Sequence, residues 1–319
     1  MNDANAATPP PADAPNRRAL AGTGFILLSG FGYGAVVVLA RIAYDEGSNA
    51  PTSLFVRFTM AGLLIWGILL ARRQVVRLPA HTIARLLAMG LLFSTGSVAS
   101  FMSVERISAS MAALIFYLYP VVVTAASTLL FRLHFSRARL GVLIASLVGC
   151  ALTVNLESGD VNLAGVLLAL LTVALYSSYV LLGSRVAAGI PALTSASWVM
   201  ISAALLMLVA ALTGILNAPL TTAINSEGWL ALLALAFFST FIAMTAFLAG
   251  IARIDLFRAA ILSTFEPIIS VVLAALLLGE RLTPLQAVGG AIIIGAALAL
   301  QLVVRREERS ARMAEPAGV

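Results

Sequence analysis

Ten apolar stretches fill almost the whole chain between residues 20 and 304, and each is about long enough to cross a membrane as a helix. An α-helix needs about 20 apolar residues to span the roughly 30 Å hydrocarbon core of a bilayer. The predicted spans are 20–43, 52–71, 82–103, 107–130, 140–156, 162–183, 193–213, 228–250, 257–278 and 284–304. We therefore expect an all-α integral membrane protein with ten transmembrane helices.

The composition excludes several classes of membrane protein. Only 11% of the residues are charged, whereas soluble domains carry about 25%. All twenty basic residues are arginine, so a Walker A loop and a lysine Schiff base are both excluded. The one cysteine, Cys150, allows no intrachain disulfide and no cysteine metal site. We expect no cofactor, no metal and no nucleic-acid partner.

The arginines predict the orientation in the membrane. If the N-terminus is cytoplasmic, sixteen of the twenty arginines fall in cytoplasmic segments, as the positive-inside rule requires. Both termini are then inside: residues 1–18 form a disordered cytoplasmic tail rather than a cleaved signal, and residues 305–319 form a second cytoplasmic tail. The expected location is the bacterial inner membrane, crossed many times.

The two halves of the chain contain a repeat. FSTGSVASFM at 93–102 matches FSTFIAMTAFL at 238–248, which has one extra residue. The segments 104–123 and 251–270 also match, with Pro120 opposite Pro267. Each unit, 19–156 and 157–304, holds five spans. Because five is odd, the second unit enters the membrane upside down, which is a recurrent architecture of secondary transporters.

These segments resemble the EamA family of the drug/metabolite transporter superfamily. The resemblance rests on VRFTMAGLLI in the second span, the paired proline segments, and PIISVVLAALLLGERLTPLQAVGGAIIIGAAL at the end. The first half departs from the last motif, since its equivalent loop, LLFRLHFSRARLGVL, lacks the Gly-Glu pair. The resemblance implies ten helices in two inverted five-helix repeats, N-in and C-in, a central cavity, and the export or facilitated movement of small metabolites, often amino acids.

Glu266, followed directly by Pro267, is the main candidate for a functional residue. A charged side chain at the centre of a membrane costs about 2.5–3.5 kcal/mol on insertion scales, so it must face other helices or a wet cavity. Ser263 and Glu266 share one helical face. The carboxylate could bind a substrate ammonium group or carry a proton. Alternatively, it stays protonated and bonds the helix carbonyls that Pro267 loosens.

Other candidate cavity residues are polar or aromatic side chains at helical spacing. In the fourth span, Tyr117 and Tyr119 are both candidates. Tyr119 aligns with Glu266, and we expect only one of the two to line the centre of the cavity. Pro120 and Pro267 are the expected hinges. The further candidates are Tyr33, Ser94, Ser97, Phe101, Tyr176, Tyr179, Phe247 and Ser263. The alternative for each is ordinary helix packing with small polar contacts.

Three features have mainly structural interpretations. Arg57 could steer a carboxylate, but the commoner outcome is that it snorkels or pairs with Asp45 or Glu46. Glu280, in a tight turn before the last span, is interpreted as structural. Small residues recur every four positions in the fifth and tenth spans, which indicates close helix packing. They predict either a scaffold between the repeats or a homodimer contact, so the protein is a monomer or a homodimer.

The sequence therefore predicts a secondary transporter with a small-molecule substrate and lipid around it, working by alternating access. The alternatives are a polytopic enzyme, a channel or an assembly factor. An enzyme acting on polyprenyl phosphates would need clustered metal-binding acids, whereas the acidic residues here are scattered. A channel would need a filter-like loop or a ring of charges.

Overall fold

The computed structural model describes residues 14–130, 136–154, 162–187, 189–215, 219–254 and 256–314, and all regular structure in these ranges is helical. Eight described helical stretches are long and apolar enough to cross a membrane, and a shorter apolar stretch covers Ile261–Leu277. An additional helix, α7, has 18 residues, or about 27 Å at 1.5 Å per residue. These elements fit the ten expected membrane helices.

Some of the ten spans are single helices and others are broken. The first half contains α1 (Ala14–Gly34), α2 (Val36–Asp45), α3 (Ala50–Ala71), α4 (Ala80–Val104), α5 (Ala109–Phe116), α6 (Tyr119–Leu130) and α7 (Arg137–Val154). The second half contains α8 (Leu163–Val186), α9 (Ala192–Thr213), α10 (Ser226–Ala236), the π-helix η2 (Phe237–Ile242), α11 (Ala243–Ile251), α12 (Leu256–Ser263), α13 (Phe265–Leu277) and α14 (Pro284–Ala314).

Many helices of one half pack against helices of the other half, in the same pattern in both directions. The third span (α4) packs along the sixth (α8), and the eighth (α10–α11) packs along the first (α1–α2). The fourth span touches the sixth as the ninth touches the first, and the second and fifth spans pack on their own counterparts, α9 and α14. If each span is equivalent to the one five places later, each of these contacts maps onto another of them or onto itself. Two units related by an approximate two-fold axis have this pattern.

The largest buried apolar cluster lies where α3, α4 and α9 meet. Leu54, Phe58 and Ile65 of α3 are fully buried there, against Leu86 of α4 and Met200 of α9. This packing joins the second span to its counterpart in the other half. It holds α3, the helix that carries Arg57, in a fixed position against α4 and α9.

The fourth and ninth spans are interrupted at matching positions. The fourth breaks at Tyr117 and Leu118, and the ninth breaks at Thr264. Each break begins three residues before a proline, Pro120 or Pro267. Proline has no backbone N–H and clashes with the carbonyl of the residue four positions earlier, which interrupts a helix. The sequence alignment of the two prolines therefore corresponds to a matched pair of helix breaks.

The extra residue in the second copy of the FST segment coincides with the π-helix η2 (Phe237–Ile242). A π-helix absorbs one inserted residue while the helix continues on either side, and such bulges are frequent at functional sites. The Thr240 hydroxyl donates to the Leu235 carbonyl oxygen, five residues earlier, at 2.9 Å. The insertion thus changes the local helix without ending the span.

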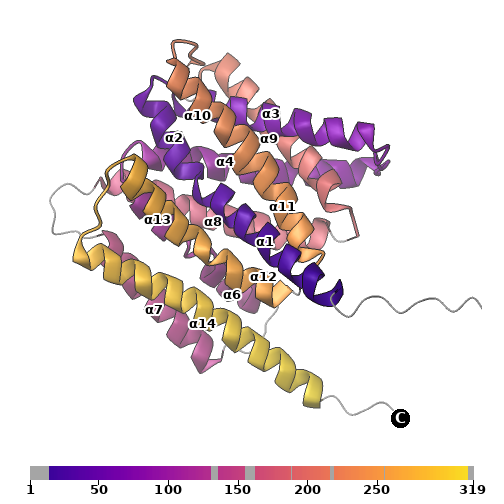
Figure 1. Cartoon of the computed structure of the whole chain (residues 1–319), viewed down its shortest axis with the longest axis vertical. Helices are drawn as coiled ribbons and strands as arrows, with labels where there is room; N and C mark the ends of the chain where they lie inside the picture. Colours follow the sequence, from indigo (N-terminus) through magenta and orange to yellow (C-terminus); the bar gives the residue numbers. More distant parts are fainter. Residues whose placement is uncertain are drawn as a thin grey trace, which may run out of the picture.

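Helices α7 and α14 lie side by side at one edge of the molecule (Figure 1). Their backbones meet at two glycines: a Cβ on Gly289 would lie 2.6 Å from the Gly149 carbonyl oxygen. The small residues of the fifth and tenth spans therefore pack against each other within one chain. This is the scaffold that the sequence predicted as one of two possibilities, and the homodimer through these helices stays a prediction.

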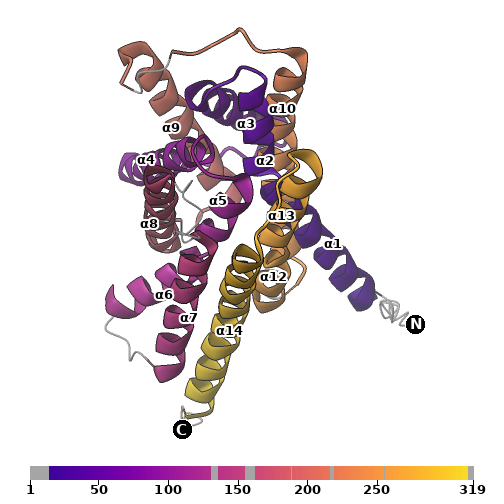
Figure 2. The same ribbon diagram turned by 90° about the vertical axis from the view of Figure 1, so that its left-hand side faces the viewer.

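The ends of the chain lie on the same side of the bundle. In Figure 1, α1 begins and α14 ends toward the lower right, and Figure 2 shows both ends in the lower part of the molecule. We call this end the terminal side.

The central cavity as the candidate functional site

A cavity of about 830 Å³ lies between the two halves. Its walls come from α1, α2, α3, α4, α5, α6, α8, α9, η2, α11, α12, α13 and α14, so both halves contribute. The lining extends to Gln301, Val304 and Arg305 near the end of α14. The cavity therefore reaches from the middle of the bundle toward the terminal side.

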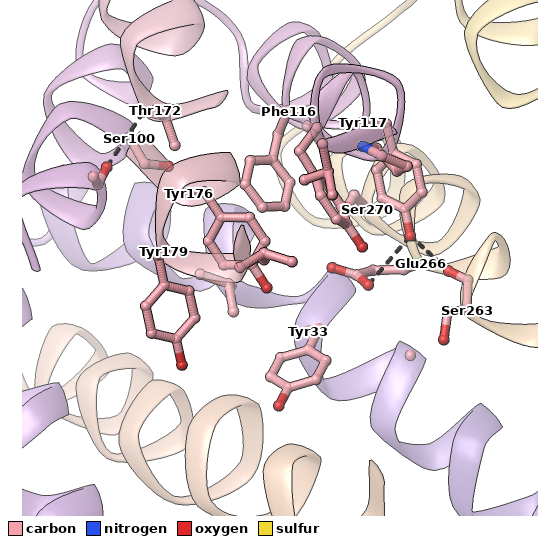
Figure 3. Close-up of a pocket in the computed structure, with 18 of the residues that line it drawn as sticks. Tyr33, Ser100, Phe116, Tyr117, Thr172, Tyr176, Tyr179, Ser263, Glu266 and Ser270 are labelled. Atoms are coloured by element: carbon pink, nitrogen blue, oxygen red, sulfur yellow. Dashed lines mark hydrogen bonds between the residues drawn. The ribbon is translucent and has the colours of Figure 1, made fainter. Parts of the chain in front are cut away.

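Glu266 lines this cavity from the first turn of α13. The Tyr117 hydroxyl lies 3.2 Å from the Glu266 Oε2 atom and 2.6 Å from the Ser263 carbonyl oxygen (Figure 3). That carbonyl is the one that Pro267 leaves without its helical donor, because Pro267 is four residues later. A side chain from the broken fourth span thus satisfies the backbone at the break in the ninth.

The first span is also interrupted beside Glu266, at Ala35. The Ser270 hydroxyl of α13 donates to the Gly34 carbonyl oxygen at 2.7 Å. A Cβ on Gly34 would lie 2.8 Å from the Glu266 carbonyl oxygen, so only glycine lets the two backbones approach this closely. Three broken spans therefore meet around one carboxylate.

A cluster of aromatic rings occupies the wall beside Glu266. The ring centroids of Tyr119 and Tyr176 are 5.0 Å apart, and Phe116 lies 5.0 Å from Tyr176 and 5.2 Å from Tyr119. Tyr179 continues the cluster at 5.8 Å from Tyr176. Offset and edge-to-face pairs at these spacings stabilise one another. We call Phe116, Tyr119, Tyr176 and Tyr179 the aromatic wall.

Tyr117 and Tyr119 both line the cavity. In a continuous helix, residues two apart point in different directions, which was the reason to expect only one of them at the centre of the cavity. The helix breaks between them: α5 ends at Phe116, and α6 begins at Tyr119. The break turns both side chains toward the same space.

Most of the other candidates also line the cavity. These are Tyr33, Ser97, Phe101, Tyr176, Tyr179, Phe247, Ser263 and the expected hinge Pro120. Pro267 is buried and is not among the lining residues. The expectation for Ser94 is wrong, because its side chain is fully buried and does not line the cavity. Its hydroxyl donates to the Gly90 carbonyl oxygen of its own helix at 2.7 Å.

Arg57 lines the cavity. From the sequence, we expected it to snorkel or to pair with Asp45 or Glu46. It neither snorkels nor pairs with the nearby acids, so that expectation is wrong. Asp45 pairs instead with Arg41, at 3.4 Å, and Glu46 accepts a hydrogen bond from Asn225 at 2.9 Å. Because α3 begins at Ala50, Arg57 lies two turns inside the helix.

The surroundings of Arg57 hold its guanidinium in place. Arg57 is only 7% exposed, and its Nε donates to the Thr240 hydroxyl at 2.8 Å. The guanidinium carbon lies 5.7 Å from the Phe58 ring and 5.8 Å from the Phe101 ring. Thr240 lies in the segment with the extra residue, which was a sequence signal of irregular structure.

Among the described residues, no three His, Cys, Asp or Glu side chains gather where they could hold a metal ion. In the same part of the chain, no ion pair joins Arg57 and Glu266 to each other or to another residue. The cavity is thus lined by one acidic residue, Glu266, and two basic residues, Arg57 in its central part and Arg305 toward the terminal side, with aromatic and hydroxyl side chains around them.

Two repeats that pack against each other around a central polar cavity are the architecture of a secondary transporter. The model of the EamA-like transporter family matches residues 20–155 and 163–301, and the chain belongs to this family. It is a multi-pass membrane transporter of the drug/metabolite type.

Individual similar proteins agree with this assignment. The chain is 27% identical to the uncharacterized transporter YcbK of Bacillus subtilis (strain 168) over 285 residues, which is 86% of this chain and 90% of that one. A solved crystal structure shares the fold with a TM-score of 0.61 and 25% identity, covering 92% of this chain and 99% of its own.

Proposed function

We propose that the protein moves small amine-bearing metabolites, amino acids foremost, across the bacterial inner membrane by alternating access. The observation that carries this proposal is Glu266, a carboxylate in the wall of the central cavity beside the aromatic wall. A carboxylate attracts an ammonium group directly, and aromatic faces attract cations as well. An acid at membrane depth is a functional candidate because its cost must be offset.

The cavity has the size and chemistry for such substrates. Small-molecule sites commonly occupy about 300–1,000 Å³ and combine apolar walls with a few polar groups. The volume here, about 830 Å³, falls in that range. It exceeds what one amino acid fills, so hydrated substrates or several amino acids of different sizes fit.

The same geometry supports alternating access. The cavity reaches toward the terminal side. At the opposite end, the Glu280 side chain accepts hydrogen bonds from the Ala109 and Ser110 backbone N–H groups, at 2.8 and 2.9 Å. This contact ties the ninth-to-tenth connection to the start of α5. Rocking of one half against the other, with bending at the breaks before Pro120 and Pro267, would open that end and close the terminal side.

Counterflow in proteoliposomes tests the proposal. The purified protein is reconstituted, and each of the twenty standard amino acids is preloaded in turn, with the radiolabelled form outside. We expect uptake of at least one amino acid above that of protein-free liposomes. The same liposomes with and without a pH gradient distinguish proton exchange from facilitated diffusion. If folded, monodisperse protein moves none of the twenty, the proposal is wrong.

A further inference from the structure

We propose that Arg57 binds the carboxylate of the substrate, so that the cavity recognises a zwitterion with its anionic end at α3 and its ammonium end at Glu266. This inference rests on the proposed function and deepens it. From the sequence, steering a carboxylate was the less common of the two roles considered for Arg57. Thr240 is then a positioning residue, which holds the guanidinium from the π-helix.

The hydrogen bonds of Arg57 leave most of its donors available. An arginine side chain has five N–H donors. Within the described part of the chain, only the Nε–H of Arg57 has a hydrogen-bond partner, the Thr240 hydroxyl. The residue is 93% buried and lines the cavity. A buried guanidinium with unused donors facing a cavity matches the planar, two-pronged geometry with which arginine binds carboxylates.

The terminal nitrogens of three other arginines donate hydrogen bonds to groups of the protein itself. Arg41 donates through NH1 to the Val104 carbonyl oxygen at 2.8 Å, and Arg253 donates to the Ala249 carbonyl oxygen at 2.7 Å. Arg106 donates to the Met102 carbonyl oxygen at 2.6 Å. These three arginines therefore donate to backbone carbonyl oxygens. Arg57 makes no such contact among the described residues.

The Arg57 and Glu266 side chains lie in different walls of the cavity, and Tyr33 of α1 and Tyr176 of the aromatic wall line the same space. No ion pair connects Arg57 and Glu266 in the described residues, so neither charge neutralises the other. A molecule with opposite charges at its two ends satisfies both groups, whereas an amine alone leaves Arg57 without an anion.

The π-helix explains how Arg57 is kept in this position. In η2, the Thr240 hydroxyl accepts from Arg57 Nε and donates to the Leu235 carbonyl oxygen, so both sides of the hydroxyl are used. The Phe58 and Phe101 rings flank the guanidinium at 5.7 and 5.8 Å. The side chain is therefore preorganised, which reduces the entropy lost when a ligand binds.

Three probes that share a phenylethyl skeleton test the proposal: L-phenylalanine, phenethylamine without the carboxylate, and 3-phenylpropionate without the amine. The aromatic wall is the reason for this skeleton. Isothermal titration calorimetry on the purified full chain in detergent gives each affinity. In the wild type, we expect phenylalanine to bind about 10- to 100-fold more tightly than phenethylamine, because hydrogen bonds to charged groups contribute that much.

Variants assign the preference to Arg57. In Arg57→Gln, phenylalanine and phenethylamine should bind within about twofold of each other, whereas Arg106→Gln, outside the cavity, should keep the wild-type ratio. Thr240→Val should weaken phenylalanine binding more than phenethylamine binding, and Thr240→Ser, which retains the hydroxyl, should restore it. A loss of folding alone would not change the ratio between two ligands.

The outcomes separate this inference from the proposed function. Equal binding of phenylalanine and phenethylamine by the wild type, which needs no variant, overturns the role of Arg57, and so does a preference that survives in folded Arg57→Gln. Binding of none of the probes also overturns it. If 3-phenylpropionate binds as tightly as phenylalanine and only Arg57→Gln abolishes this, Arg57 keeps its role while the proposed ammonium site at Glu266 is wrong.

Discussion

The Tyr117 hydroxyl donates a hydrogen bond of 2.6 Å to the Ser263 carbonyl oxygen. Tyr117 lies in the break of the fourth span, and Ser263 is the last residue before the break of the ninth. Pro267 deprives this carbonyl of its helical partner, and the tyrosine replaces it. The bond also brings the hydroxyl to 3.2 Å from Glu266. The equivalent weak points of the two halves are therefore joined directly, next to the carboxylate.

Removing this hydroxyl should impair transport. In Tyr117→Phe, the Ser263 carbonyl is left without a donor, and an unsatisfied buried polar group costs about 1–3 kcal/mol. The backbone around Glu266 should shift in response, and we expect the initial rate of counterflow to fall about tenfold or more. The measurement is the initial rate in proteoliposomes at matched protein content.

A second tyrosine provides the matched control. The Tyr44 hydroxyl donates to the Phe101 carbonyl oxygen at 3.3 Å, and Tyr44 does not line the cavity. Tyr44→Phe should leave the transport rate within about twofold of wild type, as expected for an isolated weak bond of this kind. Equal rates in Tyr117→Phe and Tyr44→Phe would show that the bond between the two breaks has no part in transport.

The close approach of α1 to α13 should be equally sensitive. A Cβ on Gly34 would lie 2.8 Å from the Glu266 carbonyl oxygen and 2.9 Å from Ile269, so Gly34→Ala must push α13 away. We expect transport to decrease strongly. Gly24, on the same helix, has nothing within 4 Å of its Cβ position. Gly24→Ala should retain wild-type transport, and similar rates in the two variants would contradict a functional role for the close contact between α1 and α13.

The scaffold of α7 and α14 can be tested by stability alone. Gly289→Ala would place a Cβ 2.6 Å from both the Gly149 carbonyl oxygen and the Thr153 backbone nitrogen. Overpacking of this kind typically costs about 1–3 kcal/mol, so the unfolding temperature in detergent should fall. Gly295→Ala on the same helix meets nothing within 4 Å and should be neutral. An unchanged unfolding temperature for Gly289→Ala would be inconsistent with intrachain packing of these helices.

Glu280 should stabilise the end of the bundle opposite the terminal side. Its carboxylate accepts from the Ala109 and Ser110 N–H groups at the start of α5, where a negative charge also interacts favourably with the helix dipole. Glu280→Ala should lower the unfolding temperature, by the equivalent of about 1–2 kcal/mol for a lost cap. Glu105, which only pairs with the adjacent Arg106 at 3.3 Å, is the control, and an equal effect of Glu105→Ala would argue against a capping role.

The hydropathy and repeat of the sequence predicted the ten spans and the matched prolines, because long apolar stretches have few alternatives in a membrane. The breaks themselves were harder to place. Pro120 and Pro267 indicated bends, but the position of each break three residues earlier depends on which carbonyl finds another donor. The break at Ala35 has no proline, and it depends on the approach of Gly34 to α13.

Only part of the cavity lining could be predicted, because the sequence does not show how each helix is rotated. Helical spacing indicates which residues share a face, but it does not give the rotation of that face. Ser94 and Ser97 were expected on one cavity-facing stripe, yet only Ser97 lines the cavity. Arg57 was misplaced because an arginine near the end of a span usually reaches water. Its partner, Thr240, comes from a π-helix in the other half, which no local pattern around Arg57 indicates.

Counterflow with Glu266→Gln tests the central claim most directly, because glutamine keeps the size of the side chain and removes the charge. The control is Glu105→Gln, an acid outside the cavity. For the amino acid that the wild type moves best, we predict that Glu266→Gln lowers the initial rate at least about tenfold, the scale of a lost charged hydrogen bond, while Glu105→Gln keeps the wild-type rate. Wild-type rates in Glu266→Gln across pH 5–8 would contradict a binding or proton-carrying role for this carboxylate.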